Sequence, residues 1–182
     1  EARKGSPAAW AYLDSLVAGA RAKPDRQLLV QARVKRGGTR AFRGDLTAGE
    51  PDLIEARTVA ESIRDTLGQI LSLQYRAHPR ELRGDFKISV HLWKRMLRLS
   101  QAWNDPDHEG WARMGLAYAD IETYRATEAR VGYRESIRLM TRAGDQFGLL
   151  EARIGLARAA IYLGDYETAR TIQLDVLDGA RG

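Results

Sequence analysis

Cysteine is absent from this chain of 182 residues, and histidine, phenylalanine and lysine are scarce. Without cysteine the chain can form neither disulfide bonds nor thiolate metal sites, which suits a reducing compartment. No apolar run reaches the roughly 20 residues that a membrane-spanning helix needs. Because no charged and then apolar leader opens the chain, we expect a cytoplasmic protein that does not bind membranes. The first residue is Glu1 rather than methionine, so we expect a piece of a longer protein.

The motifs of common catalytic and cofactor sites are missing as well. The chain contains no GxGxxG or GxxxxGK[ST] loop and no GxSxG motif. Its three histidines, His78, His91 and His108, have no pair at the spacing that places two imidazoles on one helical turn. Asp105 and Asp107 lie in a break between helices, where capping explains them better than acid–base chemistry. We therefore expect no catalytic residue, no metal site and no cofactor, in a protein that is not an enzyme.

Arginine, by contrast, is abundant. The net charge is +5, carried by 24 arginine and only 5 lysine residues. A basic surface can attract nucleic acid or acidic partners. The densest cluster surrounds Gly37-Gly38 and Phe42, which could admit a backbone and stack on a base. A solvated loop beside a helix end explains the same cluster, since cations favour helix C-termini. Its members are Arg33, Lys35, Arg36, Arg40 and Arg43.

An internal repeat dominates the second half of the chain. Residues 112–130 read ARMGLAYADIETYRATEAR and residues 152–170 read ARIGLARAAIYLGDYETAR, so nine of nineteen positions match without a gap. A fixed period of 20–50 residues is typical of solenoid proteins. The turn Gly164-Asp165-Tyr166 has counterparts upstream at Gly84-Asp85-Phe86 and Gly44-Asp45-Leu46, in register with the repeat. These positions indicate a period of about 40 residues, within the range of solenoids.

Each copy reads as two helices joined by a turn. Glycine can end a helix in the left-handed conformation, and the aspartate after it can cap the next helix. Apolar residues on both sides of the turns follow helical spacing. Breaks at Leu67-Gly68, residues 104–107 and Gly144-Asp145 separate the copies. The sequence predicts an all-α fold of seven to nine helices, arranged as a superhelical array of antiparallel helical hairpins with a period of about 40 residues.

Small residues recur at matched positions of the first helices. Gly115 and Ala117 match Gly155 and Ala157 of the next copy. Bulkier side chains there would overpack the interface, at a cost of roughly 1–3 kcal/mol per site. We therefore expect these residues to let each first helix approach the second helix of its own hairpin.

The amino-terminal part fits the repeat less well. A helix starting at Ser6-Pro7 and ending near Ala22 is followed by one from Pro24-Asp25 to residues 35–38. A turn-rich connection from Phe42 to Pro51 then precedes a helix over residues 52–66. We interpret the chain as a single domain with a degenerate or capping repeat followed by three hairpin units. Their approximate bounds are residues 1–50, 51–103, 104–143 and 144–182.

The segment IGLARAAIYLGDYETARTIQLDVL, residues 154–177, resembles a tetratricopeptide repeat, with small residues in its first helix and GDYxxA opening its second. The Gly-Asp break at 144–145, followed by GLLEARIGLARAA, is similar to the slightly long repeats of bacterial signalling and transcriptional regulators. The period of about 40 residues exceeds the roughly 34 residues of that family. The resemblance implies an α-solenoid scaffold for protein binding, in a sensory or regulatory segment of a larger bacterial signalling protein.

The resemblance also implies a concave groove for a peptide, a protein segment or a small effector. If the small residues face the partner helices, one side of the first helices lines this groove. The same side chains could instead pack neighbouring first helices together. A nucleic-acid-binding repeat that uses the basic cluster is the alternative function. The predicted groove residues are Leu71, Gln74, His78, Trp111, Met114, Tyr118, Glu122, Ile154, Arg158 and Tyr162.

The last predicted helix carries apolar residues with nothing after it to cover them. Ile172, Val176 and Leu177 lie close to the final residue, Gly182. Solenoids need a polar terminal cap to remain soluble. We expect a further helix of the full protein or a second copy of the chain, as in a homodimer, to cover this face.

Overall fold

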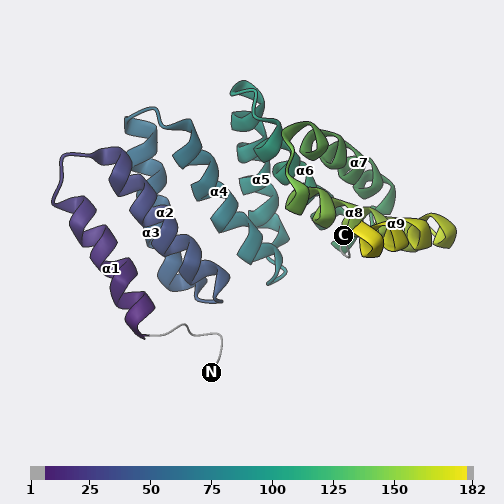
Figure 1. The fold of residues 1–182 in the computed structure, drawn as a ribbon, viewed down its shortest axis with the longest axis horizontal. Coiled ribbons are helices and arrows are strands. Elements are labelled where there is room, and N and C mark those ends of the chain that lie inside the picture. The colour runs from purple at the N-terminus through teal and green to yellow at the C-terminus, as the bar shows by residue number, and fades with distance from the viewer. Residues whose placement is uncertain (1–6, 180–182) are drawn as a thin grey trace. The chain divides into compact units, whose positions relative to one another are not determined.

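The computed structural model describes residues 7–179, and within that range it contains nine helices and no strand (Figure 1). The predicted all-α fold is confirmed. None of the described helices is both long and apolar enough to cross a membrane. The helices are α1 (Pro7–Arg21), α2 (Arg26–Phe42), α3 (Leu46–Ser62), α4 (Thr66–Glu81), α5 (Phe86–Ala102), α6 (Pro106–Glu122), α7 (Ala126–Ala143), α8 (Gln146–Tyr162) and α9 (Tyr166–Gly179).

The helices from α2 to α9 begin at evenly spaced positions, so two successive helices span the predicted period. The residue two positions before each of α3 to α9 has a left-handed φ, such as 92° at Gly44 and 75° at Gly164. Aspartate precedes every one of these helices except α7. Asp45, for example, accepts a hydrogen bond from the Ala48 amide at 3.0 Å. The turns are therefore built alike, and they recur at half the period of the hairpins.

The predicted end of the second helix at residues 35–38 is wrong, as is the turn-rich connection from Phe42 to Pro51. α2 continues through both glycines to Phe42. A Cβ atom on Gly37 would lie 2.9 Å from the Leu53 side chain, and one on Gly38 would lie 2.9 Å from the Tyr75 ring. Glycine costs a helix about 1 kcal/mol relative to alanine. Here it allows α2 to pack closely on α3 and α4, which offsets that cost.

The predicted break at Leu67-Gly68 also lies elsewhere. The turn is at Arg64-Asp65, and Gly68 belongs to the first turn of α4, where its amide donates to Asp65 at 2.9 Å. The boundary expected between residues 50 and 51 falls inside α3, which begins at Leu46 and contains Pro51. Arg64 takes the left-handed conformation without being glycine, with φ 58°, so no Gly-Asp pair marks this turn in the sequence.

Contacts between Cα atoms divide the chain into two compact units, residues 1–92 and 93–182, with the division inside α5. In the first unit α1 packs on α2, α2 packs on α3 and α4, and α3 packs on α4. In the second unit α6 packs on α7, α7 on α8 and α8 on α9, and α6 also contacts α8. The connections between helices are short, so consecutive helices within a unit run antiparallel. Fully buried side chains include Leu53, Ile70 and Leu73 in the first unit and Trp93, Met96, Ile121 and Met140 in the second.

The small residues of the second unit have two different neighbours. A Cβ atom on Gly132 of α7 would lie 2.9 Å from Ala117, so Ala117 faces its hairpin partner as predicted. Gly115 instead faces Trp93, which belongs to the helix before the hairpin; a Cβ atom there would lie 2.2 Å from the indole. The prediction that Gly115 serves its own hairpin is therefore wrong. It makes room for a buried ring between successive hairpins.

Candidate functional site

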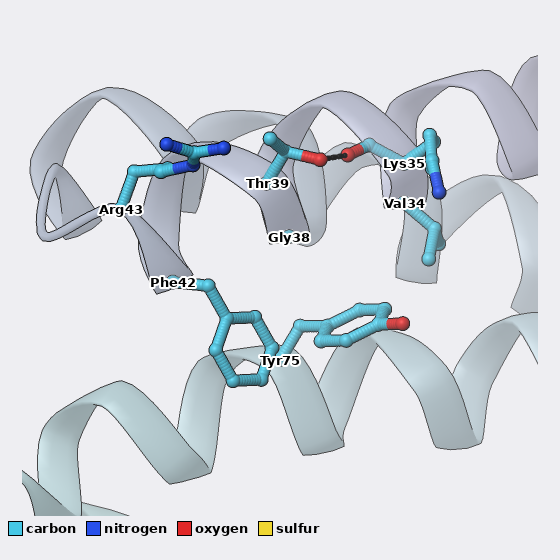
Figure 2. A pocket seen from close by; sticks show the side chains of 7 residues that line it. All are labelled: Val34, Lys35, Gly38, Thr39, Phe42, Arg43 and Tyr75. Carbon is cyan, nitrogen blue, oxygen red and sulfur yellow. Dashed lines mark hydrogen bonds between the residues drawn. The ribbon is translucent and has the colours of Figure 1, made fainter. Parts of the chain in front are cut away.

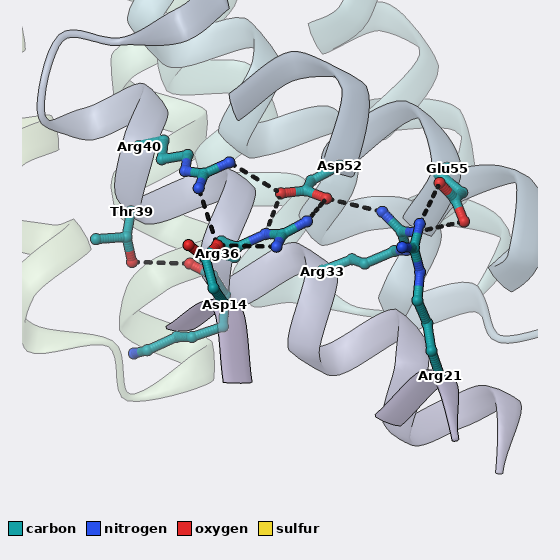
Figure 3. Close-up of polar contacts among 9 residues, drawn as sticks. Asp14, Arg21, Arg33, Arg36, Thr39, Arg40, Asp52 and Glu55 are labelled. Carbon is teal, nitrogen blue, oxygen red and sulfur yellow. Dashed lines mark hydrogen bonds and ion pairs between the residues drawn. The ribbon is translucent and has the colours of Figure 1, made fainter. Parts of the chain in front are cut away.

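Three of the five cations predicted to form a basic cluster are neutralised inside the first unit (Figure 3). Arg33 is only 2% exposed, and its guanidinium pairs with Asp52 at 2.7 Å and with Glu55 at 2.6 Å. Burial lowers the pKa of Arg33, whereas the neighbouring carboxylates oppose that shift. Arg33 is therefore an internal ion-pair partner and cannot contact a phosphate.

Arg36 and Arg40 belong to the same network. The Arg36 Nε donates to Asp52 at 2.6 Å, and its Nη1 donates to Asp14 at 2.9 Å. The hydrogen bonds that Arg36 donates to Asp52 raise the pKa of Arg36. Arg40 donates to Asp14 at 3.0 Å. The carboxylates come from α1 and α3, and the arginines come from α2, so the network ties three helices together.

The other two cations of the cluster are different. Lys35 and Arg43 are exposed on α2 and at its end, and no carboxylate among the described side chains, those of residues 7–177, lies within ion-pairing distance of either. Thr39 lies midway between them in sequence, so the three residues follow one side of the helix. Thr39 donates to the Lys35 carbonyl at 2.7 Å (Figure 2). One helix thus carries both internally neutralised and available positive charges.

Lys35 and Arg43 form part of the rim of a cavity of about 400 Å³ between α2 and α4, which we call the α2–α4 cleft (Figure 2). The rings of Phe42 and Tyr75 meet edge to face inside it, with centroids 5.5 Å apart. Phe42 remains 52% exposed, a large fraction for an aromatic side chain. The lining residues are Val34, Lys35, Gly38, Thr39, Phe42, Arg43 and Tyr75.

The cleft exists because of the side chains that face α4 from α2. Val34, Gly38 and Phe42 stand at i, i+4 and i+8 and so share one face of the helix. Gly38 in the middle has no side chain, which lets the Tyr75 ring lie against the backbone. A second cavity of about 520 Å³ shares Phe42 and Arg43 with the first and extends to Pro79, Leu82 and Arg83. The apolar surface therefore extends along α4 beyond Phe42.

The predicted groove residues of α4 lie around this cleft in different ways. The His78 ring is 5.3 Å from the Phe42 ring, centroid to centroid. Leu71 packs against the buried cluster that contains Val30 and Ala60. Gln74 is half-buried. His78 thus contacts a ring that lines the cleft, and Leu71 contributes to the core.

In the second unit, four of the predicted groove residues come together on α6 and α8. The Arg158 guanidinium lies over the Tyr118 ring at 5.2 Å and the Tyr162 ring at 5.9 Å, and it pairs with Glu122. Although burial disfavours its charge, hydrogen bonds with Glu122 and the two tyrosines raise the pKa of Arg158. These contacts join neighbouring first helices, so the charge of Arg158 is already compensated within the unit.

The remaining predicted residues of this surface are divided between core and solvent. Trp111 donates to Asp145 at 2.9 Å, and its ring stacks on Phe147 with centroids 6.0 Å apart. Met114 packs against the buried cluster around Tyr133, whereas Ile154 is 48% exposed. Both described cavities lie in the first unit.

The apolar residues predicted to need a cover on the last helix are partly open to solvent. On α9, Leu177 is exposed, and Ile172 and Val176 are half-buried. α8 is the helix that packs against α9. A covering helix or a second copy of the chain stays a prediction.

Two carboxylates approach each other where α6 and α8 begin. The Asp107 side chain lies within hydrogen-bonding reach of Asp145, and burial raises the pKa of Asp107, with the charge of Asp145 adding to the shift. His108 opposes this shift, while its own Nδ1 lies 2.6 Å from Asp105. Asp105 caps α6 as predicted, accepting from the His108 amide at 3.1 Å. Among the described residues, no group of three His, Asp or Glu side chains could hold a metal ion.

Comparison of the chain with models of known protein families gives no match, and comparison with curated proteins gives none either. Within the part of the chain that the structure describes, the α2–α4 cleft joins exposed aromatic surface to cations without a carboxylate partner. Sequence reasoning named Lys35, Phe42 and Arg43, although it placed them at or after a helix end. It missed Val34, Thr39 and Tyr75. The apolar residues Val34 and Phe42, eight positions apart on either side of Gly38, indicate a helix that continues to Phe42. The prediction of a helix end at Gly38 did not use this spacing.

Proposed function

We propose that the chain is a helical-repeat binding scaffold whose α2–α4 cleft holds a segment of a protein or peptide. One observation carries this proposal. The cleft combines exposed aromatic and apolar surface with two cations that have no internal partner among the described residues, on a helix whose other clustered arginines are neutralised. Binding sites for protein segments characteristically join an apolar centre to a polar rim.

The exposed apolar residues support the same proposal. Phe42 is 52% exposed and Leu82 is 67% exposed, and both line the second cavity. Aromatic side chains in a concave site provide a large contact area for a partner. Covering them removes apolar surface from water, which contributes about 25 cal/mol per Å². A bound segment would thus stabilise surface that the free unit leaves in solvent.

The wider setting of the scaffold is part of the proposal. The resemblance of residues 154–177 to a tetratricopeptide repeat suggests a sensory or regulatory segment of a larger bacterial signalling protein. In that setting the hairpins would present the bound segment to an output domain. The surface around Tyr118 and Arg158 would then act mainly as packing between α6 and α8, since its charge is paired with Glu122.

Nucleic-acid binding is the second candidate, and the free cations of the cleft favour it only weakly. Affinity for nucleic acid grows with the number of phosphates that a protein neutralises. Of the five residues that would serve this purpose, Arg33, Arg36 and Arg40 already pair with carboxylates. Lys35 and Arg43 remain, with Phe42 available to stack. Two charges support a peptide site better than a nucleic-acid track.

Selection from a random peptide library tests the proposed function. The wild-type chain is the bait, and each enriched peptide is then measured against Phe42→Ala and against Tyr12→Ala. Tyr12 is also an exposed aromatic residue of the first unit, but it lies on α1, outside the cleft. We expect enriched peptides to lose at least tenfold in affinity on Phe42→Ala and less than twofold on Tyr12→Ala. Failure to enrich any peptide that depends on Phe42 would overturn the proposal.

A further inference from the structure

The arrangement of charge and aromatic surface in the α2–α4 cleft restricts what the bound segment can be, and this inference rests on the proposed function. Lys35 and Arg43 stand at i and i+8, which places their Cα atoms about 12 Å apart along the helix axis. Both are exposed, and neither has a carboxylate partner among the described residues. The rim therefore presents two separate positive charges whose side chains start about two helical turns apart.

The apolar part of the cleft lies between these charges along α2. Gly38 and Phe42 belong to the same stretch of helix, and the Tyr75 ring faces Gly38 from α4 (Figure 2). A Cβ atom on Gly38 would be 2.9 Å from that ring, so the wall beside Tyr75 is bare backbone. Since the Tyr75 ring itself fills the space against Gly38, the surface left for a flat side chain to stack on is the exposed ring of Phe42, which lines the same cleft. The order along the cleft is thus cation, aromatic slot, cation.

An extended peptide matches this order. Its backbone advances about 3.3 Å per residue, so residues at i and i+4 are about 13 Å apart. Side chains at positions i, i+2 and i+4 point to the same side. We infer that the α2–α4 cleft selects an extended acidic segment with the pattern acidic–x–aromatic–x–acidic. Its two carboxylates pair with Lys35 and Arg43, and its central ring enters the slot beside Phe42 and Tyr75.

The charges around the slot indicate that the bound segment is acidic. An acidic residue at each end of the pattern neutralises a cation that the unit itself leaves unpaired, and charge-assisted hydrogen bonds are stronger than neutral ones. A nucleic-acid strand would instead present a charge at every nucleotide, and the arginines beside the slot are occupied by Asp14, Asp52 and Glu55. The isolated pair of charges therefore favours a peptide with isolated acidic residues.

The test uses fluorescein-labelled synthetic peptides and the full chain, with fluorescence anisotropy measured at low and at high salt. One peptide contains Glu-Ala-Trp-Ala-Glu between neutral flanks. The second has lysine in place of both glutamates, and the third has the compact order Glu-Trp-Glu. A short oligothymidine is the fourth probe. We expect the first peptide to bind at least tenfold more tightly than each of the other three probes.

Charge reversal of the protein sharpens the test. Lys35→Glu and Arg43→Glu should each weaken binding of the Glu-Ala-Trp-Ala-Glu peptide about tenfold. The double variant should prefer the lysine peptide, which a loss of folding could not produce. Arg26→Glu is the matched control. Arg26 is exposed on the same helix, at a sequence separation from Lys35 that places it about 180° around the helix axis. It should change the affinity less than twofold.

The outcomes separate the inference from the proposed function. If library peptides depend on Phe42 but lack the acidic–x–aromatic–x–acidic pattern, the inference is overturned and the proposed function stands. If the Glu-Trp-Glu peptide binds as tightly as the Glu-Ala-Trp-Ala-Glu peptide, the inferred spacing of the two acidic residues is overturned. If oligothymidine binds most tightly and loses affinity on Lys35→Glu and Arg43→Glu, the cleft is a nucleic-acid site, and both proposals are overturned. If neither the library nor any probe gives binding that depends on the cleft, both are overturned as well.

Discussion

The ring of Tyr133 lies against the backbone of Gly155, so closely that a Cβ atom on this glycine would be 2.1 Å from the ring Cε1. Trp93 and Gly115 repeat this relationship one period earlier, where the Cβ atom would be 2.2 Å from Cε2 of the indole. Both pairs have the same separation in sequence, and each joins a second helix to the first helix of the next hairpin. In the second unit, the contact between successive hairpins thus depends on a buried ring and a missing side chain.

Gly155→Ala should destabilise the second unit, because the added methyl group and the Tyr133 ring cannot occupy the same space. We expect a loss of roughly 1–3 kcal/mol in the free energy of unfolding, as for overpacked cores in general. Urea denaturation followed by circular dichroism measures it. Gly19→Ala is the control, because a Cβ atom there would meet nothing within 4 Å and should stabilise α1 by about 0.5–1 kcal/mol. Equal effects at the two glycines would contradict the packing explanation.

Substituting Gly-Asp for Tyr124-Arg125 at the turn before α7 should increase the stability of the protein. Tyr124 has φ 61° and is 90% exposed, and Arg125 caps α7 without a side-chain hydrogen bond. Tyr124→Gly relieves the left-handed conformation, which costs an ordinary residue roughly 1–2 kcal/mol. Arg125→Asp adds the missing cap, worth about 1 kcal/mol. Both variants should raise the melting temperature in differential scanning calorimetry. If neither does so, the repeated turn does not limit stability.

Asp52 should be the most sensitive carboxylate of the first unit. It is 3% exposed and pairs with both Arg33 and Arg36. Asp52→Asn leaves the buried Arg33 with Glu55 alone, and breaking a buried ion pair costs about 3–5 kcal/mol. We expect the lower end of that range, measured by chemical denaturation. Asp14→Asn removes a carboxylate that is half exposed and should cost less than about 1 kcal/mol. A small effect at both positions would mean that the network contributes little.

Asp107 should make the stability of the second unit depend on pH. Burial, together with the negative charges of Asp145 and Asp105, raises its pKa in the folded state, while His108 opposes the shift. The folded protein therefore binds this proton more tightly than the unfolded chain. The resulting stabilisation is complete below the ordinary aspartate pKa of about 4 and is lost as pH rises through the raised value.

Asp107→Asn removes this titration. The variant should melt at a higher temperature than the wild type at neutral pH, and the difference should shrink as the pH falls towards the ordinary aspartate pKa. Melting curves across that range provide the measurement. A difference in melting temperature that stays constant with pH would show that the pKa of Asp107 is not raised in the folded state. Asp165→Asn, at the turn before α9, serves as a reference for an aspartate at a helix start.

The helical hairpins could be predicted from sequence because their signals are local. A left-handed glycine and a capping aspartate act within a few residues of the turn that they form, as at Gly44-Asp45 and Gly164-Asp165. The same rule failed at Gly37-Gly38, where two glycines continue a helix. The glycines themselves do not distinguish the two cases, because their role depends on Leu53 and Tyr75, which come from other helices.

The sequence by itself therefore determined that the chain is a series of helices, where most of them turn, and which period they follow. Only the tertiary structure decided which arginines are available. Arg33 and Lys35 stand at i and i+2 and belong to one predicted cluster, yet one is buried against Asp52 and the other borders the cleft. The physical reason is that a helix turns about 100° per residue. Adjacent charges thus face different neighbours, and the identity of those neighbours depends on how distant helices pack.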